Sequence, residues 1–272
     1  MGQRRGVRSA GVTDKGRREQ NEDALLVDDT HRLYVVADGM GGALAGDVAS
    51  RMTVDTVNQV MTAPPKDVGT AVHDPSLSQQ ANRLLHSIQE ANRKVFQSAQ
   101  NHATQKGMGS TIAAVLVTDD CIVAANVGDS PIYRFRPGAT EPLWVKHTIE
   151  GRQERGLEPE RELDENERHT LTRALGVADD VRVDIFETPL FNGDRLLLCS
   201  DGVSDMLTPK EMREAVLGNS PHKACAHLVA TAVGRGGRDN ATALVVHCRK
   251  SRGLLAAPVR AVGRAVARLM GR

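Results

Sequence analysis

The feature that most constrains the fold is a pair of short apolar runs joined by three polar residues. Residues 112–117 and 121–127 have strand length and contain several β-branched residues, and Thr118-Asp119-Asp120 lies between them. So short a connection joins neighbouring antiparallel strands, whereas parallel strands need a crossover of a dozen or more residues. The sequence therefore predicts an antiparallel hairpin over 112–127 and argues against a wholly parallel sheet.

Further strands and helices are indicated on either side of this hairpin. Apolar runs of strand length occur at residues 33–37, 195–199 and 243–247. Longer stretches with helical spacing of apolar residues cover residues 43–62, 76–101, 209–218 and 221–234. The helical stretches come in pairs rather than alternating with single strands. This grouping predicts layered sheets covered by helices, not a Rossmann-type alternation.

Charge divides the chain into two parts. The whole sequence has a formal net charge of +1, which argues against general nucleic-acid binding. Residues 249–272 contain seven basic residues and no acidic one, whereas residues 1–248 carry a net charge of −6. Because no internal repeat and no long linker separates them, we expect one domain over 1–248 and a basic tail over 249–272.

Two interpretations of the basic tail stay open. Its apolar residues fall near one helical stripe, and arginines 260, 264, 268 and 272 recur at every fourth position on another. Such a basic amphipathic helix would contact an anionic membrane surface or an acidic partner. Pro258 and Gly263 disfavour a helix, so a disordered solubilising tail is the alternative.

Neither secretion nor a membrane span is indicated. No window approaches the roughly 18 consecutive apolar residues of a spanning helix, and residues 1–6 contain no apolar signal region. The four cysteines are scattered, and three of them lie in apolar strand-like runs, which favours buried, reduced thiols. We therefore expect a cytoplasmic protein, with the tail as its candidate peripheral contact to the inner membrane surface.

Aspartates lie at the ends of the predicted strands. Three follow an apolar run and one precedes the last run: Asp38, Asp129, Asp201 and Asp239. If the strands bring these carboxylates to one edge, they raise one another's pKa unless a cation neutralises them. Oxygen ligands suit Mg²⁺ and Mn²⁺, and a pair of such ions activates water against phosphate esters. The alternative is that Asp-Gly pairs are simply turns that follow strands.

The same aspartates belong to seven short motifs in a fixed order. These motifs are Arg18-x-x-Asn21-Glu22-Asp23, Asp38-Gly39-Met40-Gly41-Gly42, Gly109-Ser110-Thr111, Val127-Gly128-Asp129-Ser130, Leu171-Thr172-Arg173-Ala174-Leu175-Gly176, Ser200-Asp201-Gly202-Val203-Ser204-Asp205 and Asp239-Asn240. Together they resemble the metal-dependent serine/threonine protein phosphatases of the 2C type, in their compact bacterial branch. The resemblance covers residues 8–248.

The resemblance implies both a fold and a set of metal ligands. The implied fold is α+β, a four-layer α/β/β/α sandwich with two central antiparallel sheets flanked by helix pairs. Asp38 is implied to bridge two core Mn²⁺ or Mg²⁺ ions. The other implied ligands are Asp201 and Asp239 for the first ion, Glu22 and the Gly39 carbonyl for the second, and Asp129 and Asp205 for a weaker third ion.

The remaining implied roles concern the substrate. Arg18 is expected to clamp the substrate phosphate, for which a planar guanidinium is well suited, and Asp23 and Asn240 are expected to orient ligands. The implied reaction is direct attack of metal-activated water on phosphoserine or phosphothreonine in proteins, without a phosphoenzyme. A cognate serine/threonine kinase is the expected partner. The alternatives are an inactive module that binds phosphoproteins and a cation-binding domain without phosphate chemistry.

The sequence departs from the family pattern at three places. Met40 stands where many eukaryotic relatives have a histidine proposed as general acid, which leaves that acid unassigned. Pro131 replaces a usual arginine beside Asp129. His147, in Lys146-His147-Thr148, is interpreted as a solvated loop residue without a role. It precedes a charged stretch over 148–170, which corresponds to a mobile flap in the family. Two interpretations of this stretch stay open: it selects protein substrates, or it is simply a solvated surface.

Overall fold

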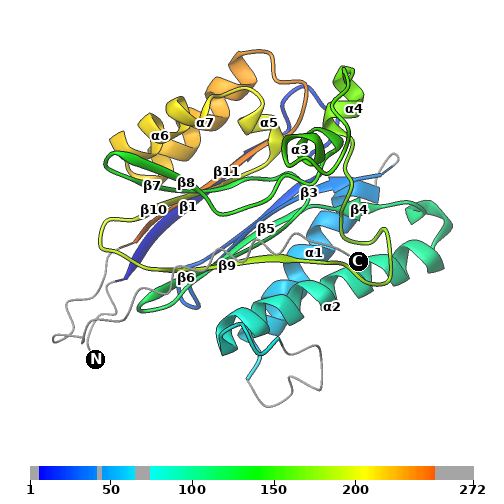
Figure 1. Cartoon of the computed structure of the whole chain (residues 1–272), viewed down its shortest axis with the longest axis horizontal. Coiled ribbons are helices and arrows are strands. Elements are labelled where there is room, and N and C mark those ends of the chain that lie inside the picture. Colours follow the sequence, from blue (N-terminus) through cyan, green and yellow to red (C-terminus); the bar gives the residue numbers. More distant parts are fainter. Residues whose placement is uncertain (1–5, 42–44, 65–73, 249–272) are drawn as a thin grey trace.

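The structure is a computed structural model that describes residues 6–41, 45–64 and 74–248. Two antiparallel sheets pack face to face (Figure 1). The first has the order β1 (Val7–Asp14), β11 (Ala241–Cys248), β10 (Arg195–Cys199), β7 (Ile132–Arg136) and β8 (Ala139–Pro142). The second has the order β2 (Asp23–Asp28), β3 (Leu33–Met40), β5 (Ile112–Val117), β6 (Cys121–Val127) and β9 (Asp184–Pro189), with β4 (Gly109–Ser110) beside β3.

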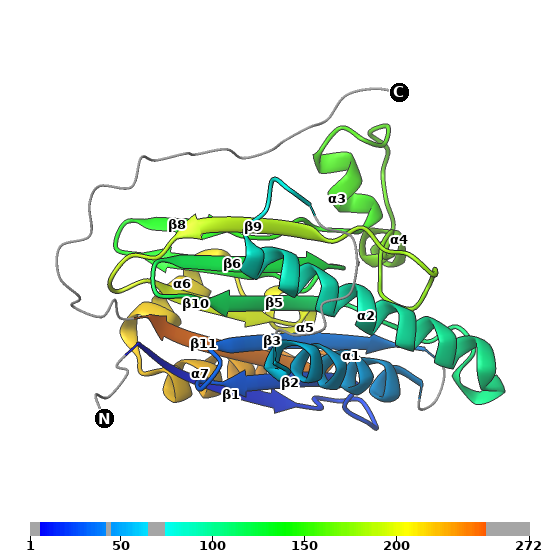
Figure 2. The ribbon, with the colours of Figure 1, turned by 90° about the horizontal axis from the view of Figure 1, so that it is seen from below.

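A helix pair covers the outer face of each sheet. The pair α1 (Ala45–Thr62) and α2 (Gln79–Asn101) packs on the second sheet, and α6 (Pro209–Gly218) and α7 (Pro221–Gly234) pack on the first (Figures 1 and 2). Shorter helices are η2 (Ala103–Gln105), α3 (Ile149–Glu154), α4 (Glu165–His169) and α5 (Asp201–Ser204). The four-layer α/β/β/α sandwich that the family resemblance implies is confirmed.

Among the four apolar clusters of the described residues, three join the layers of the sandwich. Each outer core joins a helix pair to its sheet, and the middle core lies between the sheets, with Val36, Leu198 and Leu244 among its fully buried residues. Burial of one such side chain contributes about 1.5–3 kcal/mol. Because the middle core fixes one sheet against the other, it also fixes the loops at the ends of both sheets relative to one another.

The central strands other than β7 and the two-residue β4 agree with the sequence prediction, and the edge strands were missed. The hairpin forms as predicted, with β5 and β6 antiparallel, and α6 and α7 have the predicted bounds. The edge strands β1, β8, β2 and β9 are only partly buried and carry few continuous apolar runs. A strand that is buried on only one face has fewer apolar residues than a strand buried on both faces, so it is harder to recognise in the sequence. β7 was also missed, because arginines interrupt it.

Other expectations concern the cysteines, the flap and the tail. All four cysteines are free; Cys199, Cys225 and Cys248 are buried and Cys121 is half-buried. The flap, residues 148–170, contains α3 and α4 and lies at one end of the sandwich (Figure 1). Among the described residues, no helix is long and apolar enough to cross a membrane. The tail, residues 249–272, lies outside the described residues, so its two interpretations stay predictions.

Candidate metal centre

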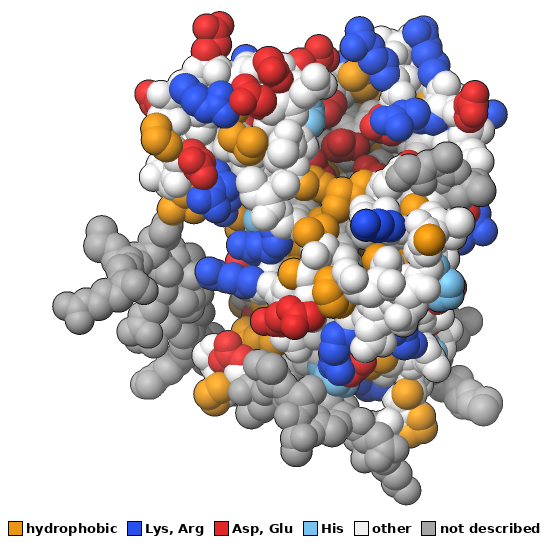
Figure 3. Space-filling view, turned by 90° about the vertical axis from the view of Figure 1, so that its right-hand side faces the viewer, with side chains coloured by type: hydrophobic (Ala, Val, Ile, Leu, Met, Phe, Trp, Pro, Cys, Tyr) orange, Lys and Arg blue, Asp and Glu red, His pale blue; other side chains and the backbone are white. Residues whose placement is uncertain are grey.

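The predicted carboxylates come from both sheets and meet at one end of the sandwich. Asp38 lies within β3, not after it, and Asp23 is its cross-strand partner on β2. From the other sheet, Asp201 begins α5 directly after β10, and Asp239 precedes β11. Figure 3 shows acidic side chains gathered in a hollow at this end of the molecule.

The pKa values show that these carboxyl groups interact. Burial, followed by the charges of Asp23 and Asp201, raises the pKa of Asp38 well above its usual value. Burial and the charge of Asp201 raise the pKa of Asp129 to about 8. Burial and the charges of Asp205 and Asp239 raise the pKa of Asp201 to about 6. Such mutual destabilisation favours binding of a cation among the carboxylates.

Two orphaned oxygens support the same conclusion. Among the described residues, the buried Oδ1 atoms of Asp201 and Asp23 have no hydrogen-bond partner. A buried polar atom without a partner is costly and rare in proteins. On Asp201, the unpaired oxygen lies among other carboxylates, where a metal ion would supply the missing interaction. The donor set therefore fits a hard divalent cation.

Glu22 and Gly39 share a second cradle beside the first turn of α1. A Cβ atom at Gly46 would stand 2.8 Å from Glu22 Oε1 and 2.9 Å from the Gly39 carbonyl oxygen. Both oxygens therefore face one point, and only a glycine at position 46 leaves it open. Burial is the main cause that raises the pKa of Glu22, and the charge of Asp239 adds to it. These two oxygens can hold one cation, as the family resemblance implies.

The glycines of the two Asp-Gly pairs decide against the turn interpretation. Neither Gly39 nor Gly202 has a positive φ. A Cβ at Gly39 would stand 1.9 Å from the Gly46 carbonyl oxygen, and one at Gly202 would stand 2.0 Å from that of Asn240. These positions exclude a side chain because another backbone segment packs against them. The glycines thus let α1 and the loop before β11 approach the carboxylates.

Asp23 is built into a buried hydrogen-bond network. Its Oδ2 atom accepts from Ser200 Oγ at 2.8 Å and from Thr242 Oγ1 at 2.6 Å. The Ser200 hydroxyl in turn accepts from the Thr242 amide at 3.0 Å. Burial raises the pKa of Asp23 to about 7, and the two hydroxyl donors oppose this rise. The network joins β2, β10 and β11 directly behind the carboxylates.

Asn240 organises the loop that carries Glu22. Its Nδ2 atom donates to the carbonyls of Lys15 at 3.0 Å and Gln20 at 2.8 Å. Its Oδ1 atom accepts from the Glu22 amide at 2.8 Å. The three bonds fix both ends of the loop relative to β11. They are consistent with an orienting role, and that role stays a prediction.

Arg18 lies in the same loop and points toward the carboxylates. Its Nη2 atom contacts Asp239 Oδ2 at 2.8 Å, and its Nε donates to the Arg238 carbonyl at 3.1 Å. The Arg18 side chain is 52% exposed, so its remaining donors face solvent. The expected phosphate clamp therefore lies at the rim of the site and is paired with a candidate metal ligand.

The flap contributes a residue that the sequence prediction did not single out. His169 ends α4, and its Nδ1 atom lies 3.4 Å from Oδ2 of Asp205. One ligand atom each of His169, Asp201 and Asp205 lie within 4.8 Å of one another. Sequence spacing gave no signal for this histidine, because 35 residues, including β9 and β10, separate it from Asp205.

The interpretation of His147 as a solvated loop residue is wrong. Its side chain is 1% exposed, and its Nδ1 accepts from the Gly128 amide at 2.9 Å. Its Nε2 lies 2.7 Å from Asp184 Oδ2, and Arg173 contacts both groups. Burial lowers the pKa of His147, which favours the neutral ring that these contacts require. His147 thus fastens Gly128, directly before Asp129, to the Leu171–Gly176 motif.

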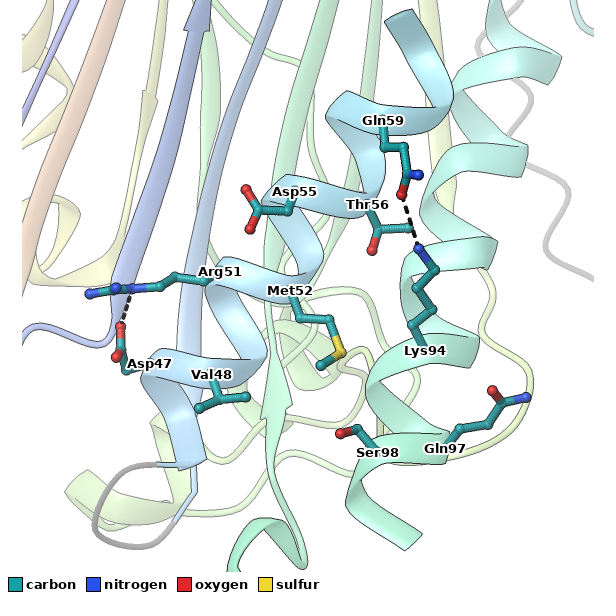
Figure 4. Close-up of a pocket in the computed structure, with 10 residues that line it drawn as sticks. All are labelled: Asp47, Val48, Arg51, Met52, Asp55, Thr56, Gln59, Lys94, Gln97 and Ser98. Carbon is teal, nitrogen blue, oxygen red and sulfur yellow. Dashed lines mark hydrogen bonds and ion pairs between the residues drawn. The ribbon is translucent and has the colours of Figure 1, made fainter. Parts of the chain in front are cut away.

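The described structure also has a groove of about 680 Å³ on the outer helix layer. It lies between α1 and α2 and is lined by the apolar side chains of Val48 and Met52 together with polar and charged ones (Figure 4). Among these, Arg51 pairs with Asp47 and Lys94 bonds to Gln59. None of its lining residues is among the predicted site residues, although the charge of Asp47 adds to the raised pKa of Glu22. The groove is therefore separate from the carboxylate cluster.

Comparisons with known proteins agree with this geometry. Residues 10–227 match the sequence model of the protein phosphatase 2C family. The serine/threonine phosphatase stp of Listeria monocytogenes is 34% identical over 241 residues, which cover 86% of this chain and 93% of that protein.

Solved structures are similar over nearly the whole chain. The phosphatase MsPP of Mycobacterium smegmatis has a TM-score of 0.71 and 32% identity, covering 88% of this chain and 97% of that one. The catalytic domain of the phosphatase PstP, in complex with two manganese ions, has a TM-score of 0.75 and 27% identity, covering 90% and 99%.

Proposed function

The chain belongs to the protein phosphatase 2C family, and on this premise we propose that it hydrolyses phosphoserine and phosphothreonine in proteins by direct attack of water on phosphorus, without a phosphoenzyme. The observation that carries the proposal is the convergence of Asp38, Asp201 and Asp239 from two sheets around an unpaired buried oxygen of Asp201. Such a cluster is costly to the fold and is explained by cations that it holds.

Two Mn²⁺ or Mg²⁺ ions fit the oxygen donors of this site. Asp38 would contact both, Asp201 and Asp239 would complete the first position, and Glu22 with the Gly39 carbonyl would complete the second. When bound, such ions lower the pKa of a water molecule and stabilise negative charge on the phosphoryl oxygens. Asp129 and Asp205 would hold a weaker third ion at the side of the cluster that faces the flap.

The residues around the ligands keep them in place. Asp23 ties β2 to Ser200 and Thr242, so the strand that pairs with Asp38 cannot move independently of β10 and β11. Asn240 holds the Glu22 amide. Because a displacement of about 1 Å in such a site can lower the rate a hundredfold, this rigid support is part of the catalytic device.

Arg18 binds the substrate in this proposal. Its guanidinium donors that face solvent would bind two phosphoryl oxygens, in the bidentate geometry that suits arginine. The contact with Asp239 holds the side chain at the metal site beforehand. Met40 cannot donate a proton, so no side chain is assigned as the general acid.

The proposed substrates are phosphorylated proteins, and the flap beside the site is the candidate surface that selects them. A cognate serine/threonine kinase is the proposed partner, because a reversible modification needs both enzymes. Comparing phosphoproteins in cells with and without this chain tests the pairing. The pairing is contradicted if the proteins that gain phosphate in the absence of this chain include neither the kinase nor any of its substrates.

Hydrolysis of a phosphothreonine peptide tests the function. The purified full chain is assayed with Mn²⁺, Mg²⁺ or excess EDTA, beside the Asp201→Asn variant. We expect turnover that requires metal and is lost in the variant. A folded wild-type chain that binds the phosphopeptide without turnover would instead be an inactive binding module, and a chain that binds neither metal nor phosphopeptide would contradict both functions.

A further inference from the structure

We infer that two basic loops beside the metal centre select phosphoproteins with acidic residues on one side of the phosphorylated residue, and that Arg238 binds one of these acids. The inference rests on the proposed function and names a class of substrate for the same site. The two loops, residues 15–18 and 235–238, form the basic rim of the metal centre.

The basic rim and the flap carry opposite charge. The rim contains five Lys and Arg residues and no acidic one, and all five are exposed. The flap, residues 148–170, contains eight acidic and four basic residues. The loop that follows β1 and helix α3 of the flap lie on opposite sides of this end of the molecule (Figure 2). Lys and Arg side chains gather on one side of the acidic hollow (Figure 3). A bound peptide therefore meets positive charge on one side and net negative charge on the other.

Close packing of the two loops fixes the rim beside Arg18. Gly16 has a φ of 58°, and a Cβ atom there would stand 2.5 Å from the Asp239 carbonyl oxygen. Only glycine lets the loops approach this closely. Arg18 Nε then donates to the Arg238 carbonyl at 3.1 Å. The backbone of Arg238 thus contacts the side chain that is proposed to clamp the phosphate.

The Arg238 side chain has donors to spare for a substrate. It is 84% exposed, and its one ion pair with a described residue joins Nη1 to Glu165 Oε1 at 3.8 Å. It donates no side-chain hydrogen bond to any described residue. Arg235, in contrast, already donates to Glu211 and to the Met206 carbonyl. Within the loop before β11, Arg238 is therefore the arginine available to a carboxylate from outside.

Glu165 shows where a substrate carboxylate would bind. Its contact with Arg238 is longer than a hydrogen bond, and its side chain is 82% exposed. Such a surface pair contributes little, so an acidic residue of the substrate can displace Glu165 at low cost. An extended peptide advances about 3.3 Å per residue, which places acids two or three positions from the phosphothreonine about 7–10 Å away. An arginine that starts beside Arg18 can reach this distance.

Three phosphothreonine peptides test the inference on the full chain with Mn²⁺. One has neutral flanks, one has glutamates only before the phosphothreonine, and one has glutamates only after it. We expect kcat/KM for one of the two acidic peptides to exceed that for the neutral peptide about three- to tenfold, mainly through KM. The other acidic peptide meets the flap and should gain nothing. Salt at about 0.5 M should remove the preference.

Variants of Arg238 show whether this side chain causes the preference. Arg238→Ala should lower the ratio of kcat/KM between the preferred acidic peptide and the neutral one to about twofold or less. Arg238→Glu should instead favour a peptide with lysines at the same positions. The matched control is Arg93→Ala, which removes an exposed arginine paired with Glu90 on α2, and it should keep the full preference.

Two results would overturn the inference and leave the proposed function intact. They are equal kcat/KM for all three peptides in the wild type, and an undiminished acidic preference in Arg238→Ala. In both, the neutral peptide is still hydrolysed, which shows that the phosphatase is active. A wild type that hydrolyses none of the peptides with Mn²⁺ would contradict the proposed function as well.

Discussion

The metal end of the sandwich and the flap beside it are built in opposite ways. At the metal end, Asp38 is part of the central strand β3, and Asp201 begins a helix that follows the central strand β10. Asn240 joins two loops by three hydrogen bonds. The flap joins the same place through exposed ion pairs from a helix of five residues. The difference indicates that the candidate metal ligands are held rigidly, whereas the flap beside them has fewer restraints.

The largest effect is expected from Asp201→Asn at the rigid end. Loss of a core ligand withdraws several kcal/mol of transition-state stabilisation, so phosphopeptide turnover should fall at least roughly a thousandfold. Steady-state kinetics with saturating Mn²⁺ measures it. In EDTA the variant should be at least as heat-stable as the wild type, because it removes a buried charge among like charges. Residual activity within tenfold would contradict the assigned role.

A second large effect is expected from His147→Ala, at the junction of the two regions. The change opens a cavity, leaves the Gly128 amide without its acceptor and removes one of the two side chains that contact Asp184, so it should destabilise the protein by about 2–4 kcal/mol. Urea unfolding measures the loss. His222→Ala, at an exposed histidine, should stay within about 0.5 kcal/mol. Equal stability of the two variants would show that His147 contributes no more to stability than an exposed histidine.

Arg18→Ala should have an intermediate effect on catalysis. Hydrogen bonds to charged groups contribute about 1.5–3 kcal/mol, so kcat/KM should fall about 10- to 150-fold. The neighbouring Arg17→Ala serves as control, because Arg17 makes no ion pair with the carboxylates in the described structure. If both substitutions lower kcat/KM equally, Arg18 contributes only general positive charge.

The dependence of Mn²⁺ stabilisation on pH tests the origin of the raised pKa values. Folding raises the pKa of Asp201, Asp23 and Asp129 to about 6, 7 and 8. The metal-free folded state therefore binds more protons than the unfolded chain above pH 4, and these groups lower stability as pH rises toward 8. Mn²⁺ needs the ionised carboxylates, so the increase in Tm that it causes should be greater by roughly a few degrees at pH 8 than at pH 5. An equal increase at both pH values would contradict the cluster as the binding site.

The smallest effect is expected from Glu165→Ala in the flap. Its pair with Arg238 spans 3.8 Å between two exposed side chains, so its removal should change stability by less than about 0.5 kcal/mol. Thermal unfolding checks this, and added salt should remove even that difference. A loss comparable to that of His147→Ala would show that the flap is held as rigidly as the metal end.

Sequence reasoning succeeded where the physical signal is local. β5, β6 and β10 are continuous apolar runs because they are buried on both faces, and they were predicted with correct bounds. It missed β2 and β9, which lie at sheet edges with one partly exposed face.

The candidate site shows the same limit. The motifs predicted which carboxylates would gather at the site, but not which residues would hold them in place. Gly39 was ambiguous because only the folded packing of Gly46 against it excludes a side chain. His147 was misjudged and His169 was missed, because both contact residues that are distant in the sequence, Gly128 and Asp184 for the first and Asp205 for the second. No spacing in the sequence encodes that arrangement.

Anomalous diffraction at the manganese edge, from crystals of the full chain grown with Mn²⁺, tests the central claim most directly. The account predicts two strong peaks about 3.5–4 Å apart on either side of Asp38. One should lie beside Asp201 and Asp239, and the other beside Glu22 and the Gly39 carbonyl. Peaks that avoid these residues, or an empty carboxylate cluster at saturating Mn²⁺, would contradict it.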